Sequence, residues 1–270
     1  MKLAKLTIVL FLYPLSVFAN ISDLNIANRD GRISKRIYNG EEIYINLAPY
    51  MALVYTDSTD TNHPFCGAAI ITTRHLISTA YFFKRHSENQ EFKVVTGRTY
   101  AFPIDNDRNN KVKKVYIHEK YDLSEIYNDI ALLELWELLK LSHLVKFIKL
   151  ATPESVKEMQ IPAMMSVTGF GKQSNGIIGR LVRKQVQILD PRIVNNFTDR
   201  LVVLENNALN MCNGDSGNPG VIDGNLTALS IFESNFCGDH PTFFTGIPYY
   251  YEWIKTYVGA KRLEEYPDLK

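Results

Sequence analysis

The amino-acid sequence predicts an all-β protein with an antiparallel sandwich or barrel architecture. From Ile37 onward, short apolar runs recur and are separated by turn residues such as Gly, Asn and Asp. Helical periodicity is scarce before the C-terminal part of the chain, which excludes a helix bundle. Six runs illustrate the predicted strands, in chain order: Met51–Tyr55, Ala68–Ile71, Lys93–Val95, Val115–Ile117, Ile130–Leu133 and Arg183–Ile188.

One amphipathic helix is predicted near the C-terminus. Its apolar residues recur at spacings of three and four, which places them on one helical face. They are Ile247, Tyr250, Tyr251, Ile254 and Val258. We interpret this aromatic-rich face as core packing, and we expect residues 259–270 to form a polar tail.

Residues 1–19 have the pattern of a secretory signal peptide. A basic start precedes a short apolar run, and small residues at Val17 and Ala19 fit a cleavage site. The apolar run is too short to cross a bilayer, and no later stretch reaches ~18 apolar residues. We therefore expect a secreted, extracellular protein in which residues 20–36 form a short propeptide.

The charge balance argues against a nucleic-acid or membrane partner. The chain has 30 basic and 29 acidic residues, so it has no net attraction for polyanions. We expect no cofactor and no metal ion, because Asp105 and Asp107 are best interpreted as part of a solvated turn.

The cysteines and the glycosylation sequons fit the same compartment. The chain has three cysteines, so one is left over after pairing in an oxidising environment. Sequons begin at Asn20, Asn196 and Asn225. Of these, Asn196 and Asn225 lie within the expected domain and are the predicted glycosylation sites.

The strongest motif runs from Cys212 to Pro219 and reads Cys-Asn-Gly-Asp-Ser-Gly-Asn-Pro. Its glycines allow a tight turn in which main-chain N–H groups converge beside the Ser216 hydroxyl. The motif resembles the nucleophile loop of the trypsin-like (S1) serine proteases. By that resemblance, Ser216 is the nucleophile, and the N–H groups of Gly214 and Ser216 form the oxyanion hole.

Three further segments follow in the order and spacing of this family. Arg36-Ile37 resembles the activation junction, where cleavage frees an Ile amino group that pairs with Asp215. The Asn-Asp-Ile-Ala-Leu-Leu segment around Asp129 resembles the segment of the triad aspartate. The Thr-Gly-Phe-Gly of residues 168–171 resembles the Thr-Gly-Trp-Gly of the family.

The resemblance covers residues 37–258, which we interpret as one trypsin-like domain. It implies two packed six-stranded antiparallel β-barrels followed by a C-terminal helix.

The catalytic histidine of the family is missing. Residues 66–71, Cys-Gly-Ala-Ala-Ile-Ile, resemble the Cys-Gly-Gly-Ser-Leu-Ile strand and fix the register. The Thr-Ala-Ala-His-Cys of the family then falls on residues 78–82. Tyr81 stands in place of the histidine, and Phe82 replaces the neighbouring cysteine.

A tyrosine is a poor substitute for this histidine. An ordinary phenol keeps its proton until about pH 10, so only about one molecule in a thousand is ionised at pH 7. In this family's triad, loss of one member leaves only a residual ~10³–10⁴-fold rate over water. The nearby His75 and His86 reach the vacancy only if the segment is remodelled. We therefore expect Asp129 and Ser216 to be remnants of the triad, with Tyr81 hydrogen-bonded toward Ser216.

The substrate pocket is predicted to be closed. Asn210 lies six residues before Ser216, where trypsin-like enzymes place an aspartate that holds Lys or Arg. Ser230 resembles the start of the pocket wall, but Phe232 replaces the glycine that admits the substrate side chain. Thr242 replaces a second pocket glycine.

By the same resemblance, Cys212 and Cys237 form the disulfide that links the two pocket loops. Cys66 is then unpaired, because Phe82 replaces its usual partner. Two alternatives stay open for Cys66: a buried thiol covered by Phe82, or a disulfide to another chain.

These features favour a secreted protease homologue that binds or regulates in extracellular proteolysis. The expected partners are extracellular proteins, including a trypsin-like protease that cleaves after Arg36. Two alternatives remain: an active endopeptidase with an unusual general base, and a weak esterase that acts through Ser216.

Overall fold

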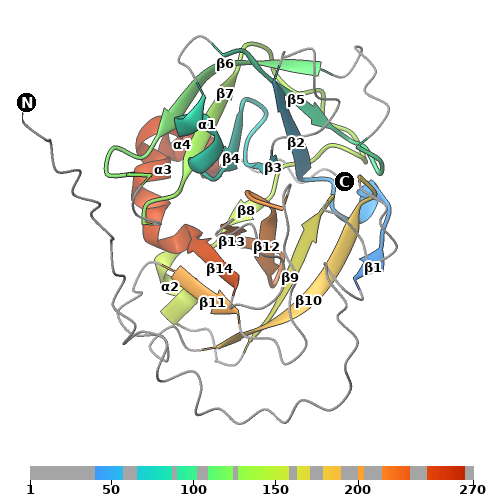
Figure 1. Ribbon diagram of the computed structural model, residues 1–270, viewed down its shortest axis with the longest axis vertical. Helices are drawn as coiled ribbons and strands as arrows, with labels where there is room; N and C mark the ends of the chain where they lie inside the picture. Colours follow the sequence, from blue (N-terminus) through green and yellow to red (C-terminus); the bar gives the residue numbers. More distant parts are fainter. Residues whose placement is uncertain are drawn as a thin grey trace, which may run out of the picture. The chain divides into compact units, whose positions relative to one another are not determined.

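Two rings of antiparallel strands make up the fold in the computed structural model (Figure 1). The structure describes residues 40–56, 66–86, 90–101, 109–123, 127–157, 163–170, 179–189, 200–203, 215–231 and 242–264. The predicted signal peptide, the propeptide, the junction at Arg36 and Ile37, and Asn196 lie outside these ranges.

The first ring is a closed six-stranded barrel in the order β2-β3-β4-β7-β6-β5. It closes because β2 pairs with both β3 and β5. Five of its strands overlap predicted apolar runs, and β4 does not. They are β2 (Met51–Thr56), β3 (Cys66–Ile70), β4 (His75–Ser78), β5 (Phe92–Thr96), β6 (Asn109–Ile117) and β7 (Ala131–Leu135).

The second ring is also closed, because β9 pairs with both β10 and β12. Its order is β9-β10-β11-β14-β13-β12, with β1 beside β10 and β8 parallel to β13. The strands are β1 (Glu41–Glu42), β8 (Lys149–Leu150), β9 (Ala163–Gly169), β10 (Val182–Leu189), β11 (Arg200–Val203), β12 (Pro219–Ile222), β13 (Asn225–Ser230) and β14 (Thr242–Gly246). The predicted pair of six-stranded antiparallel barrels is therefore confirmed.

A tight hairpin positions the strand that carries Ser230. Asp223 and Gly224 connect β12 to β13, and both have positive φ angles, 49° and 76°. A two-residue turn with positive φ at both positions matches the right-handed twist of the paired strands, which explains the Asp-Gly sequence here.

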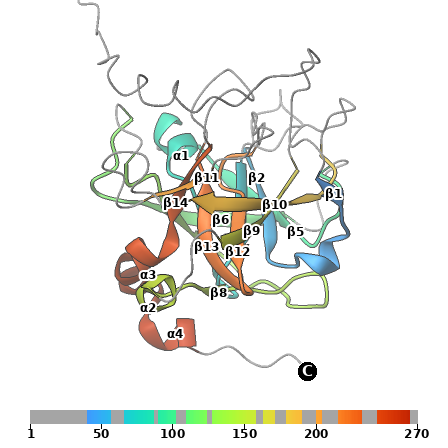
Figure 2. The ribbon, with the colours of Figure 1, turned by 90° about the horizontal axis from the view of Figure 1, so that it is seen from below.

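The C-terminal helix is also confirmed. Its first turn is of 3₁₀ type with Pro248 near the start, and the α-helix proper begins at Tyr251. The predicted polar tail instead begins with a second short helix, because Leu263 is buried against the core. Figure 2 shows α2, α3 and α4 gathered at one side of the strands. The helices are η2 (Ile45–Leu47), α1 (Tyr81–Arg85), α2 (Pro153–Lys157), η5 (Ile247–Tyr250), α3 (Tyr251–Val258) and α4 (Ala260–Glu264).

A shared core joins the two rings and the C-terminal helix. Ile77 and Leu132 of the first barrel are buried in one cluster with Leu229 of β13 and Ile254 of α3. Apolar side chains of this size each contribute ~1.5–3 kcal/mol when they are fully buried. This core therefore fixes the ends of β4 and β13, where the site residues lie. None of the described helices is long and apolar enough to cross a bilayer.

Candidate active site

Ser216 lies in a buried turn that strands of both barrels hold. Its side chain and backbone together are 1% exposed. The Ser216 carbonyl accepts the N–H of Gly67 in β3 at 2.8 Å, and the next N–H, of Gly217, donates to the Ser230 carbonyl in β13 at 2.8 Å. The turn is thus fixed from both sides.

The hydroxyl of Ser216 contacts Thr79. The two hydroxyl oxygens are 2.9 Å apart, and Thr79 is fully buried just after β4. The predicted hydrogen bond from Tyr81 toward Ser216 is therefore wrong. Tyr81 begins α1, so its phenol oxygen meets Arg85 one turn later and accepts a hydrogen bond from that guanidinium. The guanidinium also lies over the phenol ring, 5.3 Å from its centre.

Asp129 lies beside the start of α1 and is buried. Its Oδ1 accepts the main-chain N–H of Tyr81 at 2.8 Å. Asn128 precedes it with a φ of 59°, a left-handed conformation that asparagine tolerates. The Asp129 carbonyl accepts the hydroxyl of Thr245 in β14 at 2.9 Å. The carboxylate is therefore placed beside Tyr81, but through the backbone of Tyr81 and not through its ring.

The two neighbouring histidines are bound elsewhere. His75 Nδ1 lies 3.0 Å from the Thr72 hydroxyl. His86 Nδ1 donates to the Phe82 carbonyl at 2.5 Å, near the C-terminal end of α1. Neither ring contacts Ser216 in the described part of the chain.

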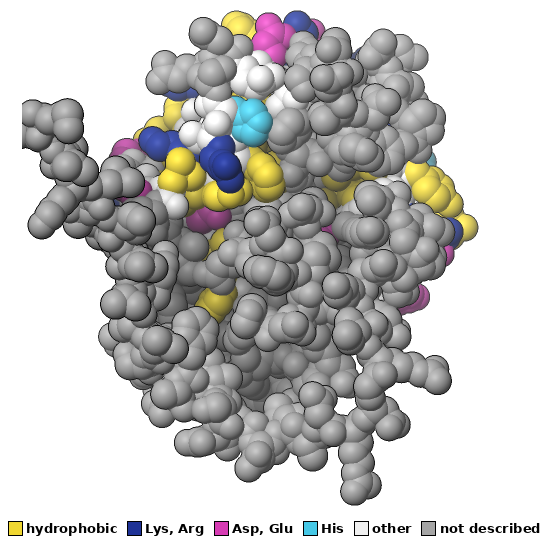
Figure 3. All heavy atoms as spheres, viewed as in Figure 1, with side chains coloured by type: hydrophobic (Ala, Val, Ile, Leu, Met, Phe, Trp, Pro, Cys, Tyr) yellow, Lys and Arg dark blue, Asp and Glu magenta, His cyan; other side chains and the backbone are white. Residues whose placement is uncertain are grey.

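Tyr81, the predicted replacement of the histidine, forms a half-buried aromatic pair with Phe82 at the surface. The rings of Tyr81 and Phe82 meet edge to face with centres 5.3 Å apart. Lys84 and Arg85 are exposed on the same short helix. Figure 3 shows basic side chains and a histidine beside hydrophobic side chains over α1. This surface has cations and aromatic rings at the position where the sequence predicts that the histidine is missing.

Asp215 receives a side-chain donor from its own turn. The amide Nδ2 of Asn218 donates to Asp215 Oδ1 at 3.1 Å. Asn218 is fully buried, and its amide group lies against Gly67 and Gly169. A Cβ atom on either glycine would come within 2.1 Å or 1.9 Å of that amide, respectively. The two glycines thus make room for Asn218 between the barrels.

Ser230, the predicted pocket-wall residue, helps to hold this turn. Its hydroxyl donates to the Asp215 carbonyl and accepts the N–H of Asn218 at 3.1 Å. Thr242 is the first residue of β14 and pairs with Val203 in β11. The other predicted residues of the oxyanion hole, pocket and disulfide lie outside the described ranges. They are Asn210, Cys212, Gly214, Phe232 and Cys237.

Cys66 is a buried thiol in the core of the first barrel. It is 0% exposed, and its sulfur lies 3.5 Å from the Ser78 hydroxyl. Phe82 packs against the same core cluster. Burial raises the pKa of Cys66 to about 12. This geometry favours the first alternative, a covered thiol, since a disulfide to another chain requires Cys66 to become exposed.

We expect Cys66 to resist alkylation at pH 8 in the folded protein, because the thiolate is the reactive form. Peptide mapping by mass spectrometry after iodoacetamide treatment, with and without urea, tests this at the single residue. Rapid labelling of the folded protein would contradict the buried placement.

The raised pKa of Cys66 also predicts how stability depends on pH. Because the pKa in the folded protein is raised from 9.0 to about 12, the unfolded chain loses the thiol proton first. The free energy of unfolding therefore falls as pH rises above about 9.

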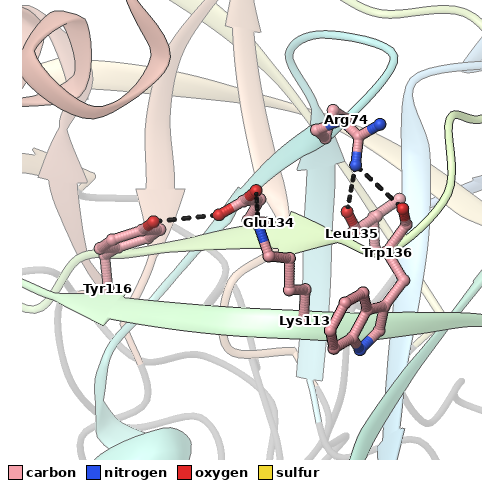
Figure 4. A network of polar contacts seen from close by, with 6 residues as sticks. All are labelled: Arg74, Lys113, Tyr116, Glu134, Leu135 and Trp136. Atoms are coloured by element: carbon pink, nitrogen blue, oxygen red, sulfur yellow. Dashed lines mark hydrogen bonds and ion pairs between the residues drawn. The ribbon is translucent and has the colours of Figure 1, made fainter.

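A polar network ties together the outer face of β6 and β7 (Figure 4). Glu134 accepts hydrogen bonds from Lys113 at 2.8 Å and from the Tyr116 hydroxyl at 3.0 Å. The bond from Lys113 is the main reason why the pKa of Glu134 is lowered. Arg74 donates to the carbonyls of Leu135 and Trp136 at 3.0 and 2.9 Å.

His75 in β4 lies opposite Glu134 in β7, and its burial predicts a fold that is sensitive to acid. Burial lowers the pKa of His75 from 6.5 to about 4. Between these values the unfolded chain holds a proton that the folded chain lacks, so stability falls as pH falls through this window. We expect the unfolding free energy of His75→Gln to depend less steeply on pH in this window. The decrease in slope should correspond to at most one fewer proton bound on unfolding. Urea unfolding at several pH values from 7 to 4.5 tests this, and His143→Gln, at an exposed histidine, is the control. If His75→Gln and wild type have equal slopes, the prediction is wrong.

Sequence reasoning missed two residues of this site, Thr79 and Asn218. Thr79 falls on the first alanine of the family's Thr-Ala-Ala-His-Cys, so a residue-by-residue comparison contained the signal. Asn218 follows the serine motif directly, but only the fold shows that its amide turns back to Asp215. Among the described residues, no group of three or more His, Cys, Asp or Glu side chains is arranged to hold a metal ion.

The family model named Trypsin matches residues 37–254, most of the chain. The chain belongs to the trypsin family. The match begins at Ile37, the first residue of the domain that the sequence predicts.

Known proteins similar to this trypsin-family chain agree with the assignment. Chymotrypsin-C of Mus musculus is 27% identical over 248 residues, covering 83% of this chain and 89% of that protein. Trypsin of Simulium vittatum is 29% identical over 250 residues, covering 86% and 98%. The structure of neuropsin, a serine protease expressed in the limbic system of mouse brain, has a TM-score of 0.67 at 22% identity, covering 82% and 99%. That likeness supports the fold.

Proposed function

We propose that this trypsin-family chain does not hydrolyse peptides and acts as a secreted binding or regulatory protein in extracellular proteolysis. The contact between the Ser216 and Thr79 hydroxyls carries the proposal. A serine attacks a carbonyl carbon efficiently only when an adjacent base takes its proton. A threonine hydroxyl is not such a base near neutral pH, because a general base must hold an unprotonated lone pair there.

The residues at the other two triad positions support the same conclusion. The Asp129 carboxylate accepts a main-chain N–H from Tyr81, whereas in the triad it orients an imidazole. The Tyr81 phenol oxygen already accepts a hydrogen bond from Arg85. A lone pair that binds a guanidinium is a poor acceptor for the proton of a serine. Among the described residues, the site therefore has a nucleophile and a carboxylate, but no group that transfers a proton between them.

A binding role gives the Arg36–Ile37 junction a purpose that does not depend on catalysis. A trypsin-like protease that cleaves after Arg36 would free the Ile37 amine, which would then pair with Asp215. Such cleavage would change the shape of the pocket loops and hence affinity for a partner. Extracellular proteins of proteolytic cascades are the partners that this role requires.

Labelling with a fluorophosphonate probe tests the loss of catalysis. The protein is first cleaved at Arg36 with trypsin, and the trypsin is then removed. We expect wild type and Ser216→Ala to show the same background label, while an active trypsin-family enzyme labels fully. Strong labelling of the wild type that disappears in Ser216→Ala would overturn the proposal. A burst with nitrophenyl esters that depends on Ser216 would indicate the weak esterase instead.

A further inference from the structure

The contact between Thr79 and Ser216 joins two buried hydroxyls from different barrels. Their oxygens are 2.9 Å apart, and the residues are 0% and 1% exposed. Either oxygen has the geometry to donate. Water does not compete strongly at such a site, so within the described part of the chain each hydroxyl depends on the other for its hydrogen bond.

The surroundings hold this pair in place. Thr79 directly follows β4, whose last residue, Ser78, donates through its hydroxyl to the Gly67 carbonyl at 2.7 Å. The N–H of Gly67 in turn donates to the Ser216 carbonyl. Threonine also has few χ1 rotamers, because it is branched at Cβ. The hydroxyl of Thr79 is therefore presented to Ser216 by a rigid strand end.

We propose that Thr79 is a second block on Ser216, independent of the missing histidine. A nucleophilic serine must give its hydrogen bond to the general base before attack. In this proposal Ser216 donates to Thr79, one of the two directions that the 2.9 Å contact fits. A histidine restored at position 81 must therefore compete with Thr79 for the same hydroxyl, and restoring the histidine alone gives only a slow nucleophile.

This inference rests on the proposed function and adds a positioning residue to the same site. It also explains why an alanine at the matching position of the family's Thr-Ala-Ala-His-Cys suits catalysis. An alanine has no hydroxyl to offer the serine, so the serine is left to the histidine.

Labelling rates of Ser216 with the fluorophosphonate probe test the inference in the full-length protein cleaved at Arg36. The variants are Tyr81→His alone, and Tyr81→His combined with Thr79→Ala, Thr79→Val or Thr79→Ser. We expect Thr79→Ala and Thr79→Val to raise the rate of the Tyr81→His protein about three- to tenfold, the equivalent of one net hydrogen bond. Thr79→Ser retains a hydroxyl and should give no gain. Thr79→Val separates the hydroxyl from the side-chain volume.

The outcomes separate this inference from the proposed function. Equal rates with and without the Thr79 hydroxyl would overturn the inference and leave the proposed function standing. Strong labelling of the wild type would instead overturn the proposed function.

If the probe labels none of the Tyr81→His proteins, a stability measurement tests the inference instead. Thr79→Val, Ser216→Ala and the double variant form a thermodynamic cycle. If the hydroxyls bind each other, the unfolding constants should deviate from additivity by about three- to tenfold. Additive effects within error would overturn the inference without any need for activity.

Discussion

Replacing Gly217 by alanine is expected to cost about 3–5 kcal/mol of unfolding free energy, because strain and overlap add at this position. Gly217 has a φ of 77°, a left-handed conformation that disfavours a side chain. A Cβ atom there would lie 2.3 Å from the Gly67 carbonyl oxygen and 2.4 Å from the Ser78 hydroxyl. These two groups are hydrogen-bonded to each other in the first barrel, so neither can move aside cheaply.

Gly224→Ala is the matched control for this prediction. Gly224 has almost the same φ, 76°, but a Cβ atom added to it would meet no other atom within 4 Å. Its substitution should cost only the conformational strain, about 1–2 kcal/mol. Urea unfolding of both variants measures the difference. Equal losses would mean that Gly217 is not packed against the first barrel.

Replacing Asn218 by alanine is expected to destabilise the fold by about 2–4 kcal/mol, because it removes a hydrogen bond to a buried carboxylate and leaves a void. The Asn218 amide donates to Asp215 Oδ1 at 3.1 Å and fills the space between Gly67 and Gly169. The same variant should loosen the Ser216 turn. Thermal and urea unfolding measure the first effect, and limited proteolysis near the turn measures the second.

Asn225→Ala is the control for the loss of an asparagine amide, in protein made without glycans. The Asn225 amide also donates to an oxygen of an aspartate, the Asp223 carbonyl, at 3.2 Å, but at a partly exposed hairpin. We expect a cost below about 1 kcal/mol, typical of a neutral hydrogen bond near water. If Asn218→Ala costs no more than this control, the amide of Asn218 does not support Asp215.

Both predictions concern the contact between the barrels and not the chemistry of one loop. Gly217 and Asn218 directly follow Ser216 in the chain, yet their packing partners lie in distant strands, β3, β4 and β9. An active enzyme needs this packing to place its nucleophile. The same packing keeps the barrels together, so the structural role of the turn does not depend on catalysis.

The strand pattern was well predicted because it depends on local alternation and turn residues. The run from Met51 to Tyr55 became β2, and Arg183 to Ile188 lies within β10. The helix face with Ile254 and Val258 was predicted for the same reason, since buried residues repeat with the helical period. The short helices were missed, and the one around Leu263 shows why: it has a single buried apolar residue.

The sequence by itself determined the trypsin-family fold, and it predicted Tyr81 at the position of the catalytic histidine, because ordered motifs fix a register along the chain. Only the tertiary structure decided that the phenol turns to Arg85 and that Thr79 contacts Ser216. Thr79 and Ser216 are 137 residues apart in the chain. Contacts at such separation depend on how two barrels pack, and side-chain hydrogen bonds then follow from rotamers that no local pattern specifies.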